Sequence, residues 1–174
     1  MCGRGAGELA GAGNAGGNWI VYIDGGARGN PGPAAAAGVI RDESGKQIQF
    51  CVYLGVTTNN VAEYLALLWA LEEARRARVP ELMVFTDSEL LVRQMTGEYR
   101  VKSPRLTSLH RRALELARAF PRFQISHVRR EDNRLADFLV NRTLDWAAKY
   151  LEPPACPGAG ADEYARGPGE GRQT

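Results

Sequence analysis

The amino-acid sequence predicts an α/β fold in which an antiparallel set of strands continues into a parallel set through helices. Two observations predict it. Short apolar or alternating runs typical of strands fall at 18–26, 35–41, 46–54, 82–88 and 123–128. Segments with helical character follow the third run onward, at 61–76, 89–95, 103–120 and 134–150. A strand reached through a long helix usually lies beside and parallel to its predecessor.

The length and composition predict one domain between two tails. The 174 residues are 44% hydrophobic and 24% charged, which is enough for one domain with a core. Residues 1–17 are rich in Gly and Ala, and residues 152–174 in Pro and Gly, so we expect disordered tails around a domain at 18–151. That domain carries 19 basic and 15 acidic residues, which favours an acidic partner only weakly.

The cysteines and the apolar runs predict a cellular location. Cys2, Cys51 and Cys156 are odd in number and widely spaced, so they form neither a disulfide framework nor a metal-ligand pattern. The N-terminus lacks the features of a secretory signal, and no apolar run approaches 18 residues. We therefore expect a soluble, cytoplasmic protein that does not enter a membrane, and we expect a monomer.

The first strand ends in an acid followed by two glycines. Residues 18–23 are mostly apolar, as in a buried strand, and Asp24 then emerges at the edge of a core. A carboxylate there needs a hydrogen-bond donor, a cation or a metal. The loop at 27–33 holds small or rigid residues that let backbone N–H groups approach a ligand. Further on, the turn at 42–45 predicts a hairpin, so the first three strands form an antiparallel meander.

The first long helix brings a second acid, Glu63, into its first turn. Thr58, Asn59 and Asn60 are typical of a helix start. With Asn60 as the N-cap, Glu63 occupies the third helical position and closes a capping box. A structural role for Glu63 is therefore as well supported here as a functional one.

The fourth strand repeats the theme of the first. It ends at Asp87 and Ser88, and if it is parallel to the first strand, Asp24 and Asp87 leave the carboxyl ends of neighbouring strands. Open α/β sheets bind their ligands there. Capping of the helix at 89–95 by Asp87 or Ser88 is the structural alternative. Asp137, near the start of the last helix, has an alternative of its own, since acids complement the helix dipole there.

Taken together, the four acids predict a metal site. Two strand ends and two helix starts carry Asp24, Glu63, Asp87 and Asp137 toward one end of the sheet. Carboxylates gathered without cations repel one another and raise their own pKa values. Hard oxygen ligands select Mg²⁺ or Mn²⁺.

Four ordered motifs resemble those of the type 1 ribonucleases H. They are YIDGGARGNPG at 22–32, TNNVAEY at 58–64, TDS at 86–88 with GEYRVK at 97–102, and REDNRLAD at 130–137. The motifs span nearly everything outside the tails. The resemblance implies a five-stranded mixed sheet, three antiparallel strands then two parallel, with helices on both faces. It also implies endonucleolytic hydrolysis of the RNA strand of RNA–DNA hybrids, leaving 5′-phosphate and 3′-hydroxyl ends.

The resemblance implies a role for each matching residue. Two Mg²⁺ ions, or Mn²⁺ as a substitute, are expected on the acidic quartet Asp24, Glu63, Asp87 and Asp137. The expected contacts to the hybrid are Gly25, Gly26, Arg28, Asn30, Thr58, Asn59, Asn60, Ser88 and Glu89. Two departures are visible: Glu89 stands where many relatives carry glutamine, and residues 97–103 leave no room for the basic protrusion of some bacterial members. Double-stranded RNA is a further possible partner.

Several alternatives remain open at this point. The chain could be a non-catalytic hybrid or double-stranded RNA binding module, or a related DNA nuclease or strand-transfer core. An auxiliary group near the fourth acid could be Arg130 or His127. The alternation at 123–128 places His127 in a strand, where a structural role is favoured. Arg130 lies in the following loop and presents a fixed positive fork suited to a phosphate, so we assign the auxiliary role to Arg130.

Overall fold

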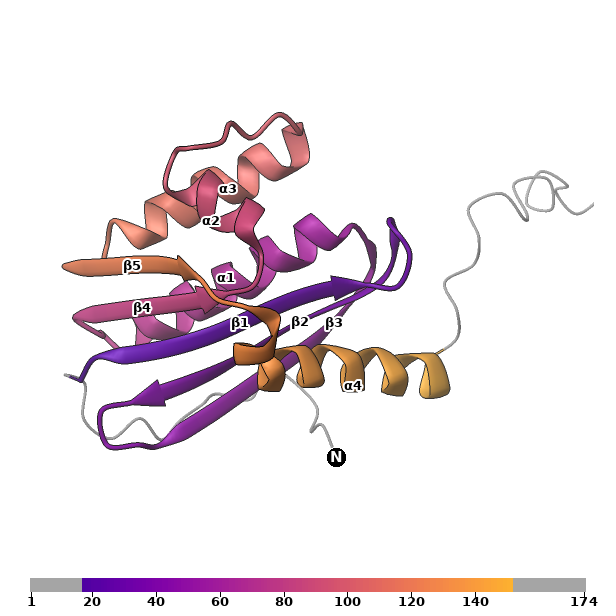
Figure 1. Cartoon of the computed structure of the whole chain (residues 1–174), viewed down its shortest axis with the longest axis horizontal. Helices are drawn as coiled ribbons and strands as arrows, with labels where there is room; N and C mark the ends of the chain where they lie inside the picture. The colour runs from indigo at the N-terminus through magenta and orange to yellow at the C-terminus, as the bar shows by residue number, and fades with distance from the viewer. Residues whose placement is uncertain (1–16, 152–174) are drawn as a thin grey trace, which may run out of the picture.

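A computed structural model describes residues 17–151, which form a five-stranded mixed sheet with helices on both faces (Figure 1). The strands lie in the order β3-β2-β1-β4-β5. The elements along the chain are β1 Trp19–Ala27, β2 Gly32–Asp42, β3 Gln47–Thr57, α1 Asn59–Arg76, β4 Glu81–Thr86, α2 Glu89–Met95, α3 Pro104–Ala117, β5 Arg122–His127, the short 3-10 helix η1 Arg130–Asp132 and α4 Arg134–Tyr150.

The pairing of the strands confirms the predicted topology. β1, β2 and β3 form an antiparallel meander, β4 lies parallel to β1, and β5 lies parallel to β4. The hairpin predicted at 42–45 joins β2 to β3, and the Gly45 N–H donates to the Asp42 carbonyl at 3.0 Å. Gly45 has φ +83°, a conformation that glycine adopts without steric cost.

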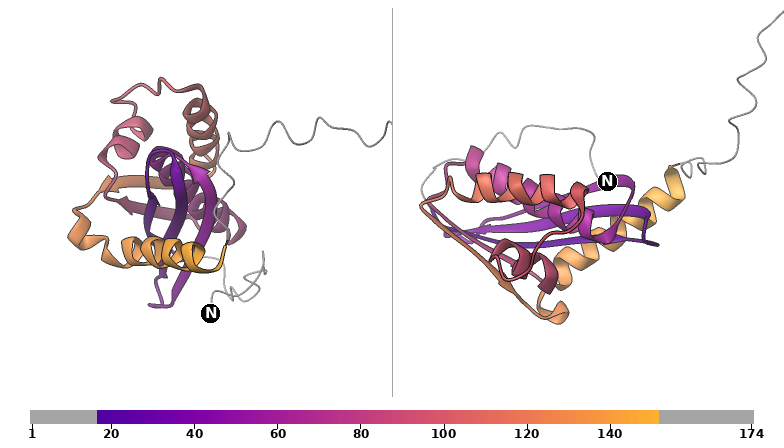
Figure 2. Two further views of the ribbon diagram at one scale, coloured as in Figure 1. Left: turned by 90° about the vertical axis from the view of Figure 1, so that its right-hand side faces the viewer. Right: turned by 90° about the horizontal axis from the view of Figure 1, so that it is seen from above.

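Helices α1, α2 and α3 cover one face of the sheet and α4 covers the other (Figures 1 and 2). The main core lies under α1 and α3, where Tyr64, Leu67 and Leu71 meet Ile23 and Val84 of the sheet. A smaller cluster lies under α4 and consists of Ala35, Ala37, Val140 and Leu144. The alanines of β2 leave room for α4 to approach the sheet closely. α4 therefore packs tightly against the sheet, although the hydrophobic cluster beneath it is small.

Two of the boundaries that differ from the predicted ones bear on the acids. β1 continues past Asp24 to Ala27, because Gly25, Gly26 and Ala27 pair with small residues of β2, and the connecting loop shrinks to 28–31. α1 starts at Asn59 with Thr58 as its N-cap, since the Thr58 Oγ1 accepts the Val61 N–H at 3.4 Å. The predicted Asn60 cap is therefore wrong. Glu63 is the fifth helical residue, which excludes a capping box.

The other helices lie close to their predicted ranges. Ser88 is the N-cap of α2, because its Oγ accepts a hydrogen bond from the Leu91 N–H at 3.4 Å. Asp87 is therefore not the cap. α3 ends at Ala117, three residues before its expected end, because the chain tightens into a turn that buries Phe120. The tails predicted at 1–17 and 152–174 lie outside the described residues except for Gly17. No helix between residues 17 and 151 is both long and apolar enough to span a bilayer.

Candidate active site

Asp24 and Asp87 leave neighbouring parallel strands at the same level. The β1–β4 register pairs Tyr22 with Phe85, and each acid lies two residues beyond that pair. The predicted level placement of Asp24 and Asp87 on adjacent parallel strands is therefore confirmed, with Asp87 directly after β4. Asp24 is buried, with 8% of its surface exposed, although it belongs to a strand that continues to Ala27.

Glu63 reaches Asp24 because α1 packs directly on β1 at Gly25. A Cβ atom on Gly25 would lie 2.2 Å from the carbonyl carbon of Ala62 and 2.3 Å from the backbone nitrogen of Glu63. Only glycine permits this approach of two backbones. Gly25 was predicted as a substrate contact, and the structure gives it this packing role. The contact places Glu63, which is 7% exposed, beside Asp24.

Asp137 joins the cluster from the start of α4, accompanied by a cation. Its Oδ1 accepts a hydrogen bond from Arg130 Nη2 at 2.6 Å, and its Oδ2 accepts one from Asn141 Nδ2 at 3.2 Å. The pKa of Arg130 is raised first by this bond, and also by the charges of Asp87 and Asp24. The Arg130 guanidinium is therefore close enough to interact with three of the four acids.

The surroundings of the two buried acids, Asp24 and Glu63, disfavour their charged forms. The pKa of Asp24 is raised to about 7, first by burial and then by the charges of Asp87 and Asp137. Burial also raises the pKa of Glu63 well above its ordinary value, with Asp24 and Asp87 adding to the effect. The Glu63 Oε2 atom is buried without a hydrogen-bond partner in the described part of the chain. Unpartnered carboxylate oxygens among like charges fit a divalent cation.

The side chains do not form a closed metal cage. Within residues 17–151, no group of three or more His, Cys, Asp or Glu side chains surrounds a common point as a bound metal requires. Arg130 binds Asp137 and Asn133 donates to Asp87. The Gly25 backbone donates to Asp24 and Glu63, and the Asn59 side chain also donates to Glu63. The acids therefore offer oxygen ligands and negative charge suited to a divalent cation. Their side chains do not form a complete coordination shell.

Asn133 is a site residue that the sequence analysis did not single out. It is 1% exposed, and its Nδ2 donates to the carbonyl of Ile23 and to Oδ1 of Asp87, both at 2.9 Å. One side chain thus ties the start of α4 to the ends of β1 and β4. Asn133 immediately precedes α4, but it forms no side-chain cap there. The only sequence signal was its place in the motif at 130–137, because its partners come from distant segments.

Seven of the nine expected hybrid contacts lie in two segments that bond to each other. The Asn59 N–H donates to Asn30 Oδ1 at 3.2 Å, and the Ala27 N–H donates to Asn59 Oδ1 at 3.3 Å. These reciprocal bonds fix the loop after β1 against the start of α1. Asn60 is exposed on the first turn of that helix. Thr58 is next to it, with its hydroxyl accepting the capping bond.

Arg28 points toward α4. Its Nη2 lies 2.5 Å from Asp145 Oδ1 and 3.5 Å from the carbonyl of Asn141. Gly26, also expected at the hybrid, faces α4 too, since a Cβ there would lie 3.0 Å from Val140 Cγ1. The loop after β1 is therefore braced on one side by α1 and on the other by α4.

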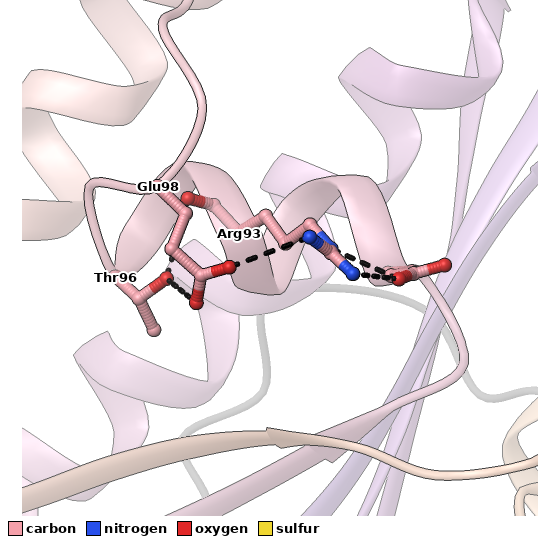
Figure 3. A network of polar contacts seen from close by, with 4 residues as sticks. Arg93, Thr96 and Glu98 are labelled. Atoms are coloured by element: carbon pink, nitrogen blue, oxygen red, sulfur yellow. Dashed lines mark hydrogen bonds and ion pairs between the residues drawn. The ribbon is translucent and has the colours of Figure 1, made fainter.

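Ser88 and Glu89, the last two expected contacts, have partners within and beside α2. The Ser88 hydroxyl caps the helix, and the Glu89 carboxylate accepts bonds from Arg93 Nε at 2.9 Å and Nη2 at 2.6 Å. Arg93 also contacts Glu98 at 3.5 Å, and Thr96 donates to Glu98 at 3.1 Å (Figure 3). The acid that departs from the family pattern thus takes part in an ion-pair network that ties α2 to the following loop.

His127 lies at the end of β5, as predicted, and its side chain is exposed. Its ring has no hydrogen-bond partner among residues 17–151. The structural role favoured for His127 therefore has no hydrogen bond to support it. Arg130, three residues later, is the group that contacts the acids directly.

The first prediction concerns Asn133. Replacing it with alanine leaves the buried Ile23 carbonyl and the Asp87 carboxylate without a donor, so Asn133→Ala should lower the free energy of unfolding by about 1–3 kcal/mol. Urea unfolding followed by circular dichroism measures this loss. Asn141→Ala is the matched control, because Asn141 donates to Asp137 at an exposed position. Equal losses in the two variants would contradict a bracing role for Asn133.

The second prediction concerns pH. Asp24 has a pKa of about 7 in the folded protein against 3.8 ordinarily, so between these values the folded state keeps a proton that the unfolded state has lost. In EDTA, the titration of Asp24 should therefore lower stability as pH rises from about 4 to about 7, by an amount on the order of 4 kcal/mol, and the raised pKa of Glu63 should add to the fall. Urea unfolding at several pH values measures it, and Mg²⁺ should restore more stability at pH 8 than at pH 5.

Two variants make this pH experiment specific. Asp24→Asn removes one of the two buried titrating carboxyls and should reduce the fall in stability, while Glu63 keeps part of it. Asp132→Asn changes an exposed acid that pairs with Arg129, and it should keep the fall. Stability that stays level or rises between pH 4 and pH 7 in the parent protein would show that Asp24 is not held in a repulsive, buried setting.

Comparisons with known proteins agree with the site and the fold. The family model described as reverse transcriptase-like matches residues 22–143. A bifunctional protein of Mycobacterium tuberculosis is 39% identical over 140 residues, which are 79% of this chain and 38% of that protein. Ribonuclease HI of Halobacterium salinarum is 40% identical over 131 residues, 75% of this chain and 66% of that protein. The chain thus spans less than two fifths of the mycobacterial relative's length and about two thirds of the haloarchaeal one's.

A solved structure extends the likeness to three dimensions. LC11-RNase H1, isolated from compost by a metagenomic approach and solved in complex with an RNA/DNA hybrid, matches with a TM-score of 0.70 and 44% sequence identity. The match covers 75% of this chain and 99% of that one. From the family match over most of the domain, the shared fold and these identities, it follows that the chain belongs to the type 1 ribonuclease H family.

Proposed function

We propose that this chain hydrolyses the RNA strand of RNA–DNA hybrids as an endonuclease, leaving 5′-phosphate and 3′-hydroxyl ends. The observation that carries the proposal is the gathering of Asp24, Glu63, Asp87 and Asp137 at the carboxyl ends of β1 and β4. The buried, unpartnered oxygen of Glu63 supports a cation there. Two relatives add support: one is named ribonuclease HI, and another was solved with a hybrid bound.

The four acids would hold two Mg²⁺ ions, or Mn²⁺ in their place. Bound divalent ions supply activation of the attacking water and stabilisation of the leaving 3′-oxygen. The protein supplies the carboxylates, and its fold fixes the two strand-borne acids through the β1–β4 pairing. Asn133 keeps Asp87 oriented, and the packing at Gly25 keeps Glu63 near Asp24.

The braced loops would recognise the hybrid. RNA is distinguished from DNA by its 2′-hydroxyls, which line a wide and shallow minor groove in A-like duplexes. Asn30, Asn59 and Asn60 offer amide groups for such a groove. The bond from the Asn59 N–H to Asn30 and the bond from the Ala27 N–H to Asn59 fix the first two before substrate arrives. This preorganisation lowers the entropy lost on binding. Thr58, beside them, is proposed to lie near a phosphate of the DNA strand.

Arg130 would act on the phosphate of the scissile bond or of the product. Its guanidinium is held by Asp137 at 2.6 Å, within the field of Asp87 and Asp24. A phosphate presented to the acids would meet this guanidinium, which binds phosphate with a planar fork of donors. The role needs no proton transfer, since an arginine stays protonated.

The third prediction tests the function itself. Asp24→Asn should abolish hydrolysis of a labelled RNA–DNA hybrid in Mg²⁺ while the domain remains folded, because the lost carboxylate belongs to a repulsive cluster. A gel compares the hybrid with double-stranded RNA, duplex DNA and a four-way junction, each with and without Mg²⁺. Asp132→Asn, at an exposed acid outside the cluster, is the matched control.

Each result of that gel has a meaning. Near-parental cleavage by Asp24→Asn would disprove the assignment of the acids. Hybrid binding without cleavage by the parent protein would indicate a non-catalytic module. Cleavage of DNA substrates alone would indicate a DNA nuclease on the same fold.

The fourth prediction separates Arg130 from His127. Arg130→Ala should lower kcat on the hybrid by roughly tenfold or more, the scale of one phosphate contact worth over about 1 kcal/mol. His127→Ala should change kcat less, because the His127 side chain is exposed at a strand end and touches none of the acids. The reverse order, or a limb near pH 6.5 in the rate profile that His127→Ala removes, would assign the role to the histidine.

A further inference from the structure

The outer face of α4 carries aromatic and basic side chains that the proposed hydrolysis does not use. We call this set the α4 stripe, and it consists of Phe138, Arg142, Trp146, Lys149 and Tyr150. The aromatic members are well exposed: 53% for Phe138, 46% for Trp146 and 61% for Tyr150. Large apolar side chains that gather on one exposed face commonly mark a binding surface.

Helical geometry places the stripe on one side of α4. Its members recur at spacings of three or four residues, apart from the adjacent Lys149 and Tyr150, so they share a face about 18 Å long. The opposite face buries Val140 and Leu144 against the sheet. The stripe is therefore not needed to pack α4 against the sheet.

The stripe is positively charged. The Arg142 guanidinium carbon lies 6.0 Å from the ring centroid of Phe138, and Lys149 Nζ lies 5.1 Å from that of Tyr150. Neither cation has a carboxylate partner in the described chain. Asp145, an acid on the same helix, is already paired with Arg28.

The charge and the rings decide which partner fits. A second copy of the chain packed on the same stripe would bring two positively charged surfaces together, and these repel. A duplex hides the faces of its bases, whereas a single strand exposes both bases and phosphates. Aromatic rings combined with cations are the means by which proteins hold single strands without reading their sequence.

We propose that the α4 stripe binds a single-stranded polynucleotide. Bases stack on Phe138, Trp146 and Tyr150, while Arg142 and Lys149 contact phosphates. The stripe begins one residue after Asp137, so a strand bound there continues from the acid cluster along α4. This inference goes beyond the proposed hydrolysis and does not require it, since none of the four acids takes part.

The test measures binding by the full chain in EDTA, so that cleavage plays no part. Fluorescence anisotropy follows labelled oligomers of 20 deoxythymidines or 20 uridines, and binding of either one supports the proposal. The triple variant Phe138→Ser, Trp146→Ser, Tyr150→Ser should raise Kd at least tenfold. The double variant Arg142→Gln, Lys149→Gln should reduce the slope of log K against log salt by about 1.4, for two phosphate contacts.

A charge-matched control makes the result specific. Arg111→Gln, Arg118→Gln removes two exposed cations from α3 and its C-cap, and should leave the slope nearly unchanged. Intrinsic fluorescence gives a second readout, because the chain has three tryptophans. Quenching by the oligomer should persist in Trp69→Phe and disappear in Trp146→Phe, a variant that keeps an aromatic ring.

Three outcomes would overturn the proposal. They are unchanged affinity in the triple variant, equal loss of slope in the control double variant, and stronger binding of a 20-residue polyglutamate than of either oligonucleotide. The last would indicate an acidic protein segment as the partner. Hybrid hydrolysis in Mg²⁺, measured on the same variants, keeps this test apart from that of the proposed function.

Discussion

The close approach of α1 to β1 at Gly25 is the contact on which the candidate site depends. Two backbones touch there, and any side chain at Gly25 would meet the carbonyl carbon of Ala62 at 2.2 Å. The contact forces Glu63 beside Asp24 and removes both from water. Two like charges then share a buried space, and the raised pKa of each acid follows from that placement.

The rest of the domain stabilises this unfavourable arrangement. α1 is packed along much of its length by Tyr64, Leu67 and Leu71, so the main core holds the helix where its first turns are electrostatically strained. Donors from the opposite side help: Asn133 binds Asp87, and Arg130 binds Asp137. Sites of this kind commonly reduce stability locally while the surrounding structure holds them in place.

The sequence predicted the sheet and the acids well because both depend on local patterns. Strand runs, the hairpin turn and the helix-connected strand set the topology, and this places Asp24 level with Asp87. Side-chain partners were not predictable in the same way. The bonds of Asn133 to Ile23 and Asp87 join positions 110 and 46 residues apart, and no local pattern encodes them. The Asn60 cap failed because Thr58, two residues earlier, accepts the capping bond.

The size of the Arg130 guanidinium explains why this side chain cannot neutralise the inner pair of acids, Asp24 and Glu63. Its guanidinium hydrogen-bonds to Asp137, which lies nearer the surface, and acts on Asp24 only through its charge. Asp24 and Glu63 are 8% and 7% exposed, and the Glu63 Oε2 atom has no donor in the described chain. A planar group on a long side chain needs room that this buried pair does not offer. A small ion of double charge needs little room and offsets more of the repulsion. Size and charge together therefore favour a divalent ion over a side-chain cation at the inner pair of acids.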